Sequence, residues 1–420
     1  MTFYLERGYR TASPVVPDSI KYIYEGGCTM IYAGIDVAKD KHDCCITNSD
    51  GEILAGPFTI TNNKAGFLDL YDRIKSAGGS PLDVKVGLEA TGHYSYNILG
   101  FLIDKGLPTF VINPMHTNLY RKSLSLRLTK TDKVDAKTIA MMLMSGMDFQ
   151  SYSVASYHNE ELKSLTRYRF DKVQERARLK TSIARLIVIL FPELEALVPT
   201  LHLNTVYLLL EEFPGASFVA KAHLTRLTNL IATASKGHYG KDKAVEFRNA
   251  ARDSVGSVMP AKSLELQHTI RLIRELDSEI DDVENRIKIH MDSIGSPITT
   301  IPGINFRMGA MILAEIGDFN RFSNADKILA YAGMSPSTYQ SGNYESTHAR
   351  MEKRGSKYLR YALFNAAKYV CIWDPTFNAY LARKRAEGKH YNVAITHAAK
   401  KLVRVIYALE KSGKPYTKIS

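Results

Sequence analysis

Four carboxylates stand at positions that suit a divalent metal ion better than they suit simple packing. Asp36 follows an apolar run in AGIDVAKD, and Glu89 ends another in VGLEATGHY. Asp132 and Asp135 are three residues apart in KTDKVDAK, so a helix there would place both on one face. Mg²⁺ prefers hard oxygen ligands and keeps several waters, so a few carboxylates suffice to hold it. Two such ions can stabilise the attacking and leaving oxygens of a phosphodiester displacement.

Each acid also has a structural interpretation that needs no metal. Asp132 would serve as a helix N-cap, and Asp135 as a solvated helix residue. Asp36 is harder to explain in this way, because a charge at the end of an apolar strand needs a partner. An acid after the first strand of an α/β domain also occurs in sugar-kinase-like ATPases. Those enzymes need glycine-rich phosphate loops, and the sequence shows none.

Three further polar residues near these acids are expected to have no catalytic role. Asp40 and Asp43 lie in a polar, turn-like stretch, which predicts a surface position for both. His93 could assist at a metal site, but a satisfied structural histidine is the preferred interpretation. The metal-site hypothesis therefore depends on the four carboxylates alone.

Basic residues surround the last two acids. The segment YRKSLSLRLTKTDK supplies Arg121, Lys122, Arg127, Lys130 and Lys133. Such a cluster beside a metal site suits a nucleic-acid backbone, and a solvated loop is the alternative. The whole chain is also basic, with 55 Lys and Arg against 43 acids and a net charge of +12. This excess favours a polyanionic partner such as DNA or RNA, although a basic protein can simply be soluble.

A candidate nucleophile, Ser341, lies far downstream in the polar segment STYQSGNYES. The following Gly342 permits unusual backbone angles and the close approach of a bulky phosphate. A serine hydroxyl is a poor nucleophile at neutral pH, so it needs a base or a metal ion. From the pattern alone, several neighbouring serines compete with it. The competitors are interpreted as turn formers, loop residues or helix caps: Ser335, Ser337, Ser346 and Ser356.

Two tyrosines in the same segment raise a different chemistry. Tyr339 and Tyr344 would suit a tyrosine recombinase. That reaction normally surrounds the tyrosine with a set of Arg and His residues, which cannot be assembled here from the sequence.

A basic helix start follows the serine segment. MEKRGSKYLRYALFNAA places Lys353, Arg354, Lys357 and Arg360 around this start, where backbone amides and the helix dipole favour phosphate. Upstream, IPGINFRMGAMILAEIG is similar to a helix-hairpin-helix, in which the Pro302–Gly303 turn would present amides to a phosphate. A plain helix connector is the alternative for that turn.

The elements that must position these residues follow from periodicity. Residues 30–155 alternate apolar strand patterns with amphipathic helices, which predicts an α/β domain. Residues 156–292 are expected to be helical, with a coiled coil and a helical insert, and residues 293–420 form a basic helical domain. The coiled coil rests on a heptad seam, which would pair two long helices within one chain or between protomers. The seam consists of Ile273, Leu276, Ile280, Val283 and Ile287.

The first 29 residues show no clear periodicity before the strand pattern that begins at Ile31. Met30 ends the segment EGGCTM, whose Glu-Gly-Gly a ribosome-binding-site-like run can encode, so residues 1–29 are either a translated leader or a flexible arm. The four cysteines have no metal-binding spacing, which favours a reducing cytoplasm. No apolar run reaches about 18 residues, so no membrane span is expected.

The motifs resemble a known family when taken in order. GIDVAKDKH, LEATGHY, VINP and KTDKVDAKTIA resemble the DEDD, RuvC-like N-terminal domain of the IS110 group of insertion-sequence transposases, also called bridge-RNA-guided recombinases. The segment from TTIPGINF to KRGSKYLRYAL resembles the second, C-terminal transposase domain of that family. Each motif is weak alone, but their order is highly specific, and the resemblance runs from about Met30 to the last helices.

The resemblance implies a fold and a set of site residues. The N-terminal domain would be RNase H-like, and Asp36, Glu89, Asp132 and Asp135 would hold Mg²⁺. Ser341 would attack DNA and become covalently joined to it.

The resemblance also implies partners. A structured non-coding guide RNA would pair with both donor and target DNA, in the bacterial cytoplasm and at the nucleoid during action. Homodimers would assemble into a tetramer, in which the two catalytic domains of one site come from different protomers.

We therefore expect a DNA transposase or recombinase that is guided by RNA and uses a phosphoserine intermediate. One alternative is a RuvC-like nuclease that uses metal ions to cut by hydrolysis. Another alternative, from a different class, is a non-catalytic scaffold that binds RNA.

Overall fold

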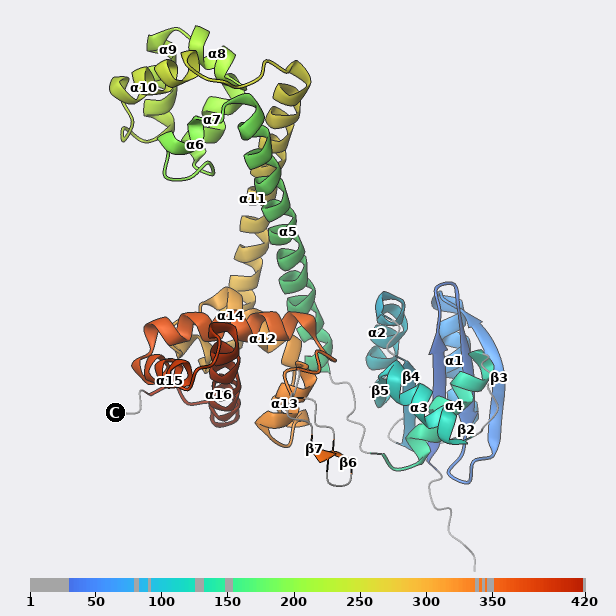
Figure 1. Ribbon diagram of the computed structural model, residues 1–420. Coiled ribbons are helices and arrows are strands. Elements are labelled where there is room, and N and C mark those ends of the chain that lie inside the picture. Colours follow the sequence, from blue (N-terminus) through green and yellow to red (C-terminus); the bar gives the residue numbers. More distant parts are fainter. Residues whose placement is uncertain are drawn as a thin grey trace, which may run out of the picture. The chain divides into compact units, whose positions relative to one another are not determined.

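The computed structural model describes residues 30–78, 83–89, 92–124, 132–147, 154–336, 340–341, 344–345 and 351–417. The predictions for residues 1–29, Arg127 and Lys130 lie outside these ranges. The chain divides into two compact units, residues 1–154 and 155–420, here called the N-terminal and C-terminal units (Figure 1). In the described ranges, no helix combines the length and the apolar character needed to cross a membrane.

A five-stranded sheet forms the centre of the N-terminal unit. Strands β1 (Ile31–Val37), β2 (Lys41–Thr47) and β3 (Ile53–Thr61) form an antiparallel meander. Strands β4 (Val84–Glu89) and β5 (Thr109–Ile112) run parallel to β1, and the strand order is β3-β2-β1-β4-β5. The predicted α/β character of this unit is confirmed, as are the strand pattern that begins at Ile31 and the apolar run that ends at Glu89. β3 was not predicted, because it is largely exposed and contains a glycine and a proline.

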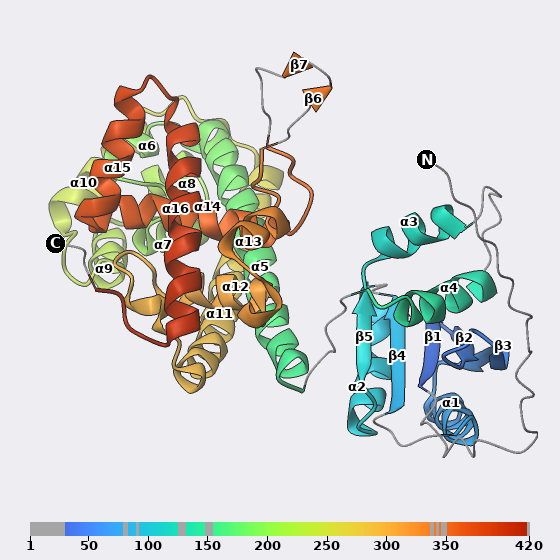
Figure 2. The same cartoon turned by 90° about the horizontal axis from the view of Figure 1, so that it is seen from below.

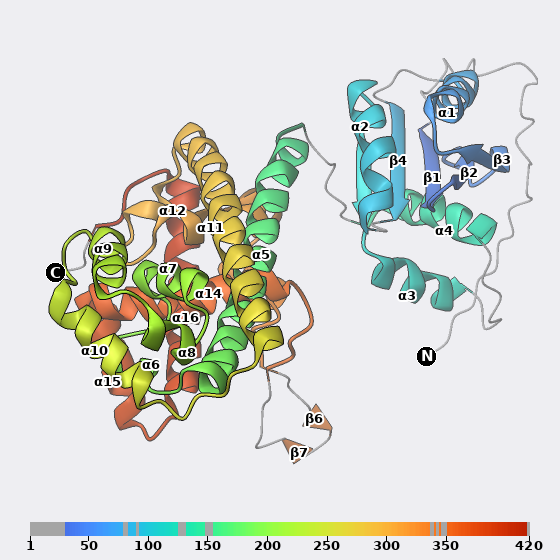
Figure 3. The same ribbon diagram turned by 90° about the horizontal axis from the view of Figure 1, so that it is seen from above.

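Helices cover both faces of this sheet (Figures 2 and 3). Helices α1 (Lys64–Ser76) and α2 (Tyr96–Asp104) share a hydrophobic core with one face. Helix α4 (Asp132–Met144) lies on the other face together with α3 (Pro114–Leu124), where Ile139 and Leu143 pack with Phe110 and Ile112. The basic segment that forms α3 had been interpreted only as a charge cluster, so this helix is a finding of the structure.

Two glycines let α4 lie directly against the sheet. Gly34 of β1 and Gly87 of β4 are paired in the register of the two strands. A Cβ atom on Gly34 would lie 2.1 Å from the carbonyl oxygen of Ala136 and 2.5 Å from the amide nitrogen of Ala140. On Gly87 it would lie 2.8 Å from Cγ2 of Ile139. The backbone of α4 therefore occupies the space that a side chain at Gly34 would fill, and side chains of α4 occupy the space at Gly87.

Two long helices, α5 (Val154–Leu190) and α11 (Pro260–Ile294), form an antiparallel hairpin in the C-terminal unit (Figure 1). Ion pairs join them at Arg169–Glu284, Lys172–Glu279 and Arg176–Asp277. The predicted seam residues are all buried: Ile273, Leu276, Ile280, Val283 and Ile287. The two helices thus pair within one chain. Coiled-coil packing of this hairpin stays a prediction.

A small helical insert connects these helices at one end of the hairpin (Figure 1). It has its own hydrophobic core, which includes Phe191, Leu210 and Phe247. The insert comprises α6 (Leu194–Leu197), α7 (Asn204–Glu212), α8 (Ala216–Lys221), α9 (Leu224–Ala234) and α10 (Lys241–Arg252).

A helical bundle packs at the other end of the hairpin around a second core (Figure 1). Its helices are α12 (Phe306–Ile316), α13 (Ala325–Tyr331), α14 (Lys357–Trp373), α15 (Pro375–Ala386) and α16 (Tyr391–Ser412). Between α13 and α14 lie the two-residue strands β6 (Gln340–Ser341) and β7 (Tyr344–Glu345). The mostly helical character of this unit confirms the expectation for residues 156–420.

The glycine contacts predict that Gly34→Ala loosens α4. Overpacking of this kind costs about 1–3 kcal/mol. Hydrogen–deuterium exchange of the full chain should therefore show amides of residues 132–144 exchanging about 5- to 150-fold faster. Gly240→Ala is the control, because a Cβ atom there meets nothing within 4 Å. Unchanged exchange in α4 of Gly34→Ala would contradict the close packing described above.

Candidate active site and nucleic-acid interface

Asp36 and Glu89 lie at the carboxyl ends of neighbouring parallel strands. The register pairs Ile35 with Leu88, so Asp36 and Glu89 occupy the next position on each strand. Side chains two residues apart on a strand point to the same face. Both carboxylates therefore share the face of Gly34 and Gly87, which is the face that α4 covers, and both are half-buried.

The start of α4, which carries the other two predicted acids in its sequence, lies on the same face. Asp135 directly precedes Ala136, whose carbonyl oxygen lies over Gly34. The Asp135 side chain is buried, and its Oδ1 accepts a hydrogen bond of 2.7 Å from Nη1 of Arg121. Asp132 is the first residue of α4, and its side chain lies outside the described part of the structure. Arg121, predicted to contact nucleic acid, is thus an ion-pair partner of a site carboxylate.

The side chains that the structure describes do not form a ready-made metal cage. Among them, no group of three or more His, Cys, Asp or Glu residues is close enough to hold an ion. The structure shows instead that the backbone brings the acid-bearing segments together at one edge of the sheet. The metal ligands Asp36, Glu89, Asp132 and Asp135 stay predictions.

Asp43 lies inside the fold, so the predicted surface position is wrong. It is the register partner of Asp36 across β1 and β2, and it is only 5% exposed. Its Oδ1 accepts a hydrogen bond of 2.5 Å from the Thr59 hydroxyl. Strand β2 begins at Lys41 and is buried at every later position, so Asp43 lies within a buried strand and not in a polar turn. A further carboxylate therefore stands beside Asp36 on the face that α4 covers.

The remaining polar groups near this face are poor candidates for chemistry. Burial raises the pKa of the Cys45 thiol on this face and of the Cys44 thiol in the core of the opposite face, which keeps both neutral. His93 is exposed in the turn after β4, and its ring contacts that of Tyr94 at 4.0 Å between centroids. Of the basic residues predicted here, Lys122 and Lys133 are exposed.

Ser341 lies at the end of β6, where its backbone pairs with Tyr344 of β7. The segment that carries Ser341 starts and ends at two adjacent parts of the chain, residues 331–336 and 351–356, which are here called the stem. In this stem the amide of Ser356 donates to the carbonyl of Tyr331 at 3.0 Å, and that of Lys353 donates to Gly333 at 3.0 Å. The Ser341 side chain itself lies outside the description. Backbone hydrogen bonds therefore hold together the two parts of the stem from which the Ser341 segment leaves, and the role of Ser341 stays a prediction.

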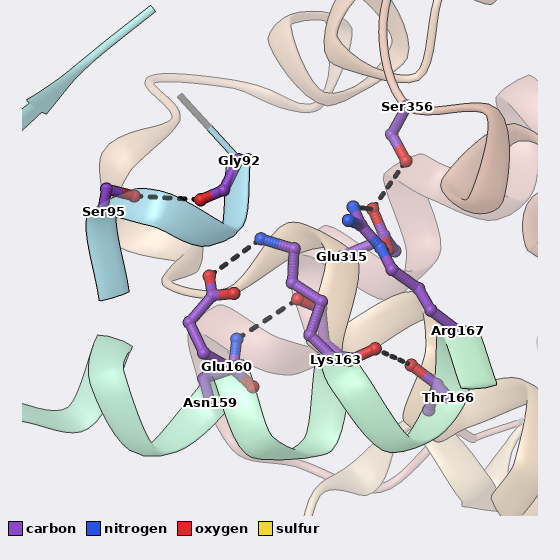
Figure 4. Close-up of polar contacts among 10 residues, drawn as sticks. Gly92, Ser95, Asn159, Glu160, Lys163, Thr166, Arg167, Glu315 and Ser356 are labelled. Carbon is purple, nitrogen blue, oxygen red and sulfur yellow. Dashed lines mark hydrogen bonds and ion pairs between the residues drawn. The ribbon is translucent and has the colours of Figure 1, made fainter. Parts of the chain in front are cut away.

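A buried carboxylate fixes this stem to the long hairpin. Oε1 and Oε2 of Glu315 on α12 accept hydrogen bonds from Nε and Nη2 of Arg167 on α5, at 2.6 and 3.0 Å (Figure 4). The Ser356 hydroxyl donates to the same carboxylate at 2.6 Å and accepts from the amide of Leu359, capping α14. Burial would lower the pKa of Arg167, but its interactions with Glu315 raise that pKa above its ordinary value. One ion pair thus ties together α5, α12 and the start of α14.

The predicted basic residues at the start of α14 have different environments. Lys353, Arg354 and Lys357 are exposed. Arg360 is half-buried, and its Nη1 donates to the carbonyl of Ala332 at 2.8 Å. This hydrogen bond links α14 to the part of the stem that contains Ala332.

The Pro302–Gly303 turn has a packing explanation. A Cβ atom on Gly303 would lie 2.6 Å from the carbonyl carbon of Tyr369, and the φ angle of this glycine is +93°. The turn therefore presses against the backbone of α14, which supports the helix-connector alternative.

Two family models match the chain, the first over the N-terminal sheet domain and α5, and the second over part of the helical bundle. Residues 33–192 match the DEDD transposase domain of IS110 elements, described as a transposase. Residues 295–382 match a domain described as "Transposase IS116/IS110/IS902 family". The first match includes the four predicted metal ligands, and the second includes Ser341 and the basic start of α14.

Curated proteins similar to this chain align over most of its length. The IS900 uncharacterized 42 kDa protein of Mycobacterium paratuberculosis is 26% identical, covering 92% of this chain and 97% of that protein. The pilin gene-inverting protein of Moraxella lacunata is 25% identical, covering 92% and 98%. The mini-circle putative transposase for IS117 of Streptomyces coelicolor is 26% identical, covering 87% and 90%.

The buried ion pair predicts that Glu315→Ala loosens the base of the Ser341 segment. Removing one partner of a buried pair costs about 3 kcal/mol at the low end, which applies because Arg167 keeps 38% of its side chain exposed. Calorimetry of the full chain should show a lower transition temperature for the C-terminal unit. Glu161→Ala is the control, because Glu161 is 65% exposed and pairs with His290 at 3.6 Å. An equal, small shift in both variants would contradict this role.

Proposed function

We infer that the chain is a transposase or recombinase of DNA, because residues 33–192 and 295–382 match transposase domains of the IS110/IS116/IS902 family. We propose the following mechanism. The chain cuts and rejoins donor and target DNA through a covalent phosphoserine at Ser341. The carboxylates at the edge of the N-terminal sheet hold Mg²⁺ for this reaction.

The observation that carries the proposal is the shared position of Asp36 and Glu89. They lie at the ends of neighbouring strands, on the face where α4 starts with Asp132 and Asp135. The antiparallel meander followed by two parallel strands supports the RNase H-like interpretation of this domain. Structural packing alone gives no reason to gather so many acids on one covered face, since like charges opposite each other destabilise a sheet.

The chemistry of these residues fits Mg²⁺. All the proposed ligands are carboxylates, which are the hard oxygen ligands that this ion prefers. Asp36 also stands opposite Asp43, so a cation at this edge would offset their mutual repulsion. When bound, the metal ions would stabilise the negative charge that develops on the attacking and leaving oxygens. Arg121, which now neutralises Asp135, would supply positive charge to a nearby phosphate once the metal ion takes its place.

At Ser341 the reaction exchanges one phosphodiester linkage for another, so the energy of the linkage is conserved. The serine hydroxyl attacks the phosphorus, the bond from phosphorus to one sugar oxygen breaks, and a serine–phosphate bond forms. The serine proton passes to a base, and the departing sugar oxygen takes up a proton. The hydroxyl end of another strand then attacks the phosphoserine and releases the serine, so no nucleotide cofactor is consumed.

The proposed partners are donor DNA, target DNA and a structured guide RNA. The net charge of +12 and the exposed Lys122, Lys133, Lys353, Arg354 and Lys357 support binding to polyanions. The guide RNA, and the assembly of homodimers into a tetramer, rest on the family resemblance. Arg127 and Lys130 are proposed contacts outside the described residues.

Ser341→Ala separates this mechanism from hydrolysis. The wild-type protein with RNA and matched DNA should yield a protein–DNA adduct that survives denaturant, and the variant should yield none and cut no strand. Ser346→Ala, which changes a serine in the same segment, should form the adduct at close to the wild-type rate. Strand cleavage by Ser341→Ala would support the metal-dependent nuclease instead. The scaffold alternative predicts no cleavage by any of the three proteins.

Asp36→Asn tests the carboxylates. This change keeps the size of the side chain but removes one charged ligand, so strand exchange should fall by at least about a hundredfold. The amount of RNA that copurifies with the protein should stay close to that of the wild type. Sequencing of this RNA checks the guide at the same time. Normal strand exchange by the variant would remove Asp36 from the reaction.

A further inference from the structure

A pocket opens beside the stem from which the Ser341 segment leaves the bundle. It has a volume of about 480 Å³, which is within the usual range for small-ligand sites. Its walls are the two parts of the stem, one face of α14 and the start of α16. The lining residues are Met334, Met351, Lys353, Lys357, Arg360, Tyr361, Phe364, Asn365, Asn392, Val393 and Thr396.

The lining separates into a cationic part and an apolar part. Lys353, Lys357 and Arg360 bring positive charge, and none of the described residues that line the pocket is acidic. Met334, Met351 and Phe364 give an apolar surface, and Tyr361 adds a ring that is 39% exposed. A free phosphate would match only the cations, and an apolar ligand would match only the rest.

The aromatic ring of Phe170 packs against the ring of Tyr361 and holds it in place. The ring of Phe170 on α5 meets it edge-on, with 4.8 Å between the centroids and an angle of 77° between the planes. This contact leaves part of the tyrosine surface open to a ligand while it restricts the rotation of the side chain. A fixed, exposed aromatic ring between cations is suited to stacking of a nucleic-acid base.

Amide side chains complete the lining. Asn365 donates from Nδ2 to the carbonyl of Tyr361 at 2.9 Å, which orients its amide group on α14. Asn392 and Thr396 lie one turn apart on α16. Such groups form hydrogen bonds with the edge of a base, which a pocket for a simple anion does not need.

We propose that this pocket binds one unpaired nucleotide of the DNA strand that Ser341 attacks. The base lies against Tyr361 and Phe364, and its phosphate lies at Lys353 and Lys357. Because the pocket wall is the stem of the Ser341 segment, the bound nucleotide fixes the position of the strand relative to the nucleophile. This inference rests on the proposed function for the choice of DNA as the occupant.

Photochemical cross-linking tests the location of this site. The full chain is irradiated with a single-stranded octathymidylate that carries one 5-iododeoxyuridine. Mass spectrometry should identify a cross-linked peptide that contains Tyr361 or Phe364. Cross-links found only outside α14 would overturn the proposal. So would a cross-link formed at this site by the corresponding oligouridylate but not by the DNA, because the pocket would then be an RNA site.

Binding measurements test the chemistry of the site. Fluorescence anisotropy compares octathymidylate with an abasic octamer of equal length and charge. The wild type should prefer the thymidylate by about tenfold, the effect of one stacked base. Tyr361→Ala should reduce this preference to below about threefold, whereas Lys357→Gln should weaken the binding of both oligomers alike. A preference that is unchanged in Tyr361→Ala would overturn the proposal.

The control variant is Tyr369→Ala. Tyr369 is 53% exposed on the same helix, but it does not line the pocket. This variant should keep both the cross-link and the thymidylate preference. If it loses the preference as fully as Tyr361→Ala does, general stacking on exposed aromatic rings replaces the pocket as the explanation.

The serine mechanism and the pocket can fail separately. Ser341→Ala should lose the covalent adduct while it keeps the cross-link at α14. A wild-type protein that forms the cross-link but no adduct would remove the serine mechanism and retain the pocket. A wild-type protein that forms the adduct but has no base preference and no cross-link at α14 would do the reverse.

Discussion

The N-terminal site depends on how closely the backbone of α4 approaches the sheet. Gly34 and Gly87 stand side by side on β1 and β4. The carbonyl of Ala136 occupies the space above Gly34, and the Ile139 and Leu143 side chains occupy the space above Gly87. Asp36 and Glu89 follow these glycines by two residues, on the same face. A helix kept at the usual distance by side chains would hold Asp135 farther from the strand ends. The position of the carboxylates therefore depends on the absence of side chains at Gly34 and Gly87.

In the C-terminal unit, hydrogen bonds to a buried carboxylate hold the candidate site segment in position. Glu315 anchors the stem of the segment that carries Ser341 by accepting hydrogen bonds with its two carboxylate oxygens. Arg167 comes from the long hairpin, and Ser356 comes from the helix that follows the loop. Because the Glu315 carboxylate is buried, removal of its charged partner would be strongly destabilising. This arrangement links the hairpin to the loop that carries Ser341 and to the pocket beside it.

Local patterns in the sequence predicted the elements, and long-range packing decided the details. The apolar runs of β1 and β4 were recognisable, and so was the heptad seam of α11, because their periodicity lies within one segment. Asp43 was misplaced because its burial depends on pairing with β1 and on a hydrogen bond from β3, a strand that was not foreseen. The partners of Glu315 could not be predicted either, since Arg167 and Ser356 lie 148 and 41 residues away along the chain. The same applies to the pocket, whose walls come from three separate segments.

We propose that DNA becomes joined to the chain at Ser341. The most direct measurement isolates the denaturant-stable protein–DNA species, digests both components, and maps the nucleotide-bearing residue by mass spectrometry. We expect a single phosphodiester link at Ser341. A link at Tyr339 or Tyr344, or cut DNA ends without any link to protein, would contradict it.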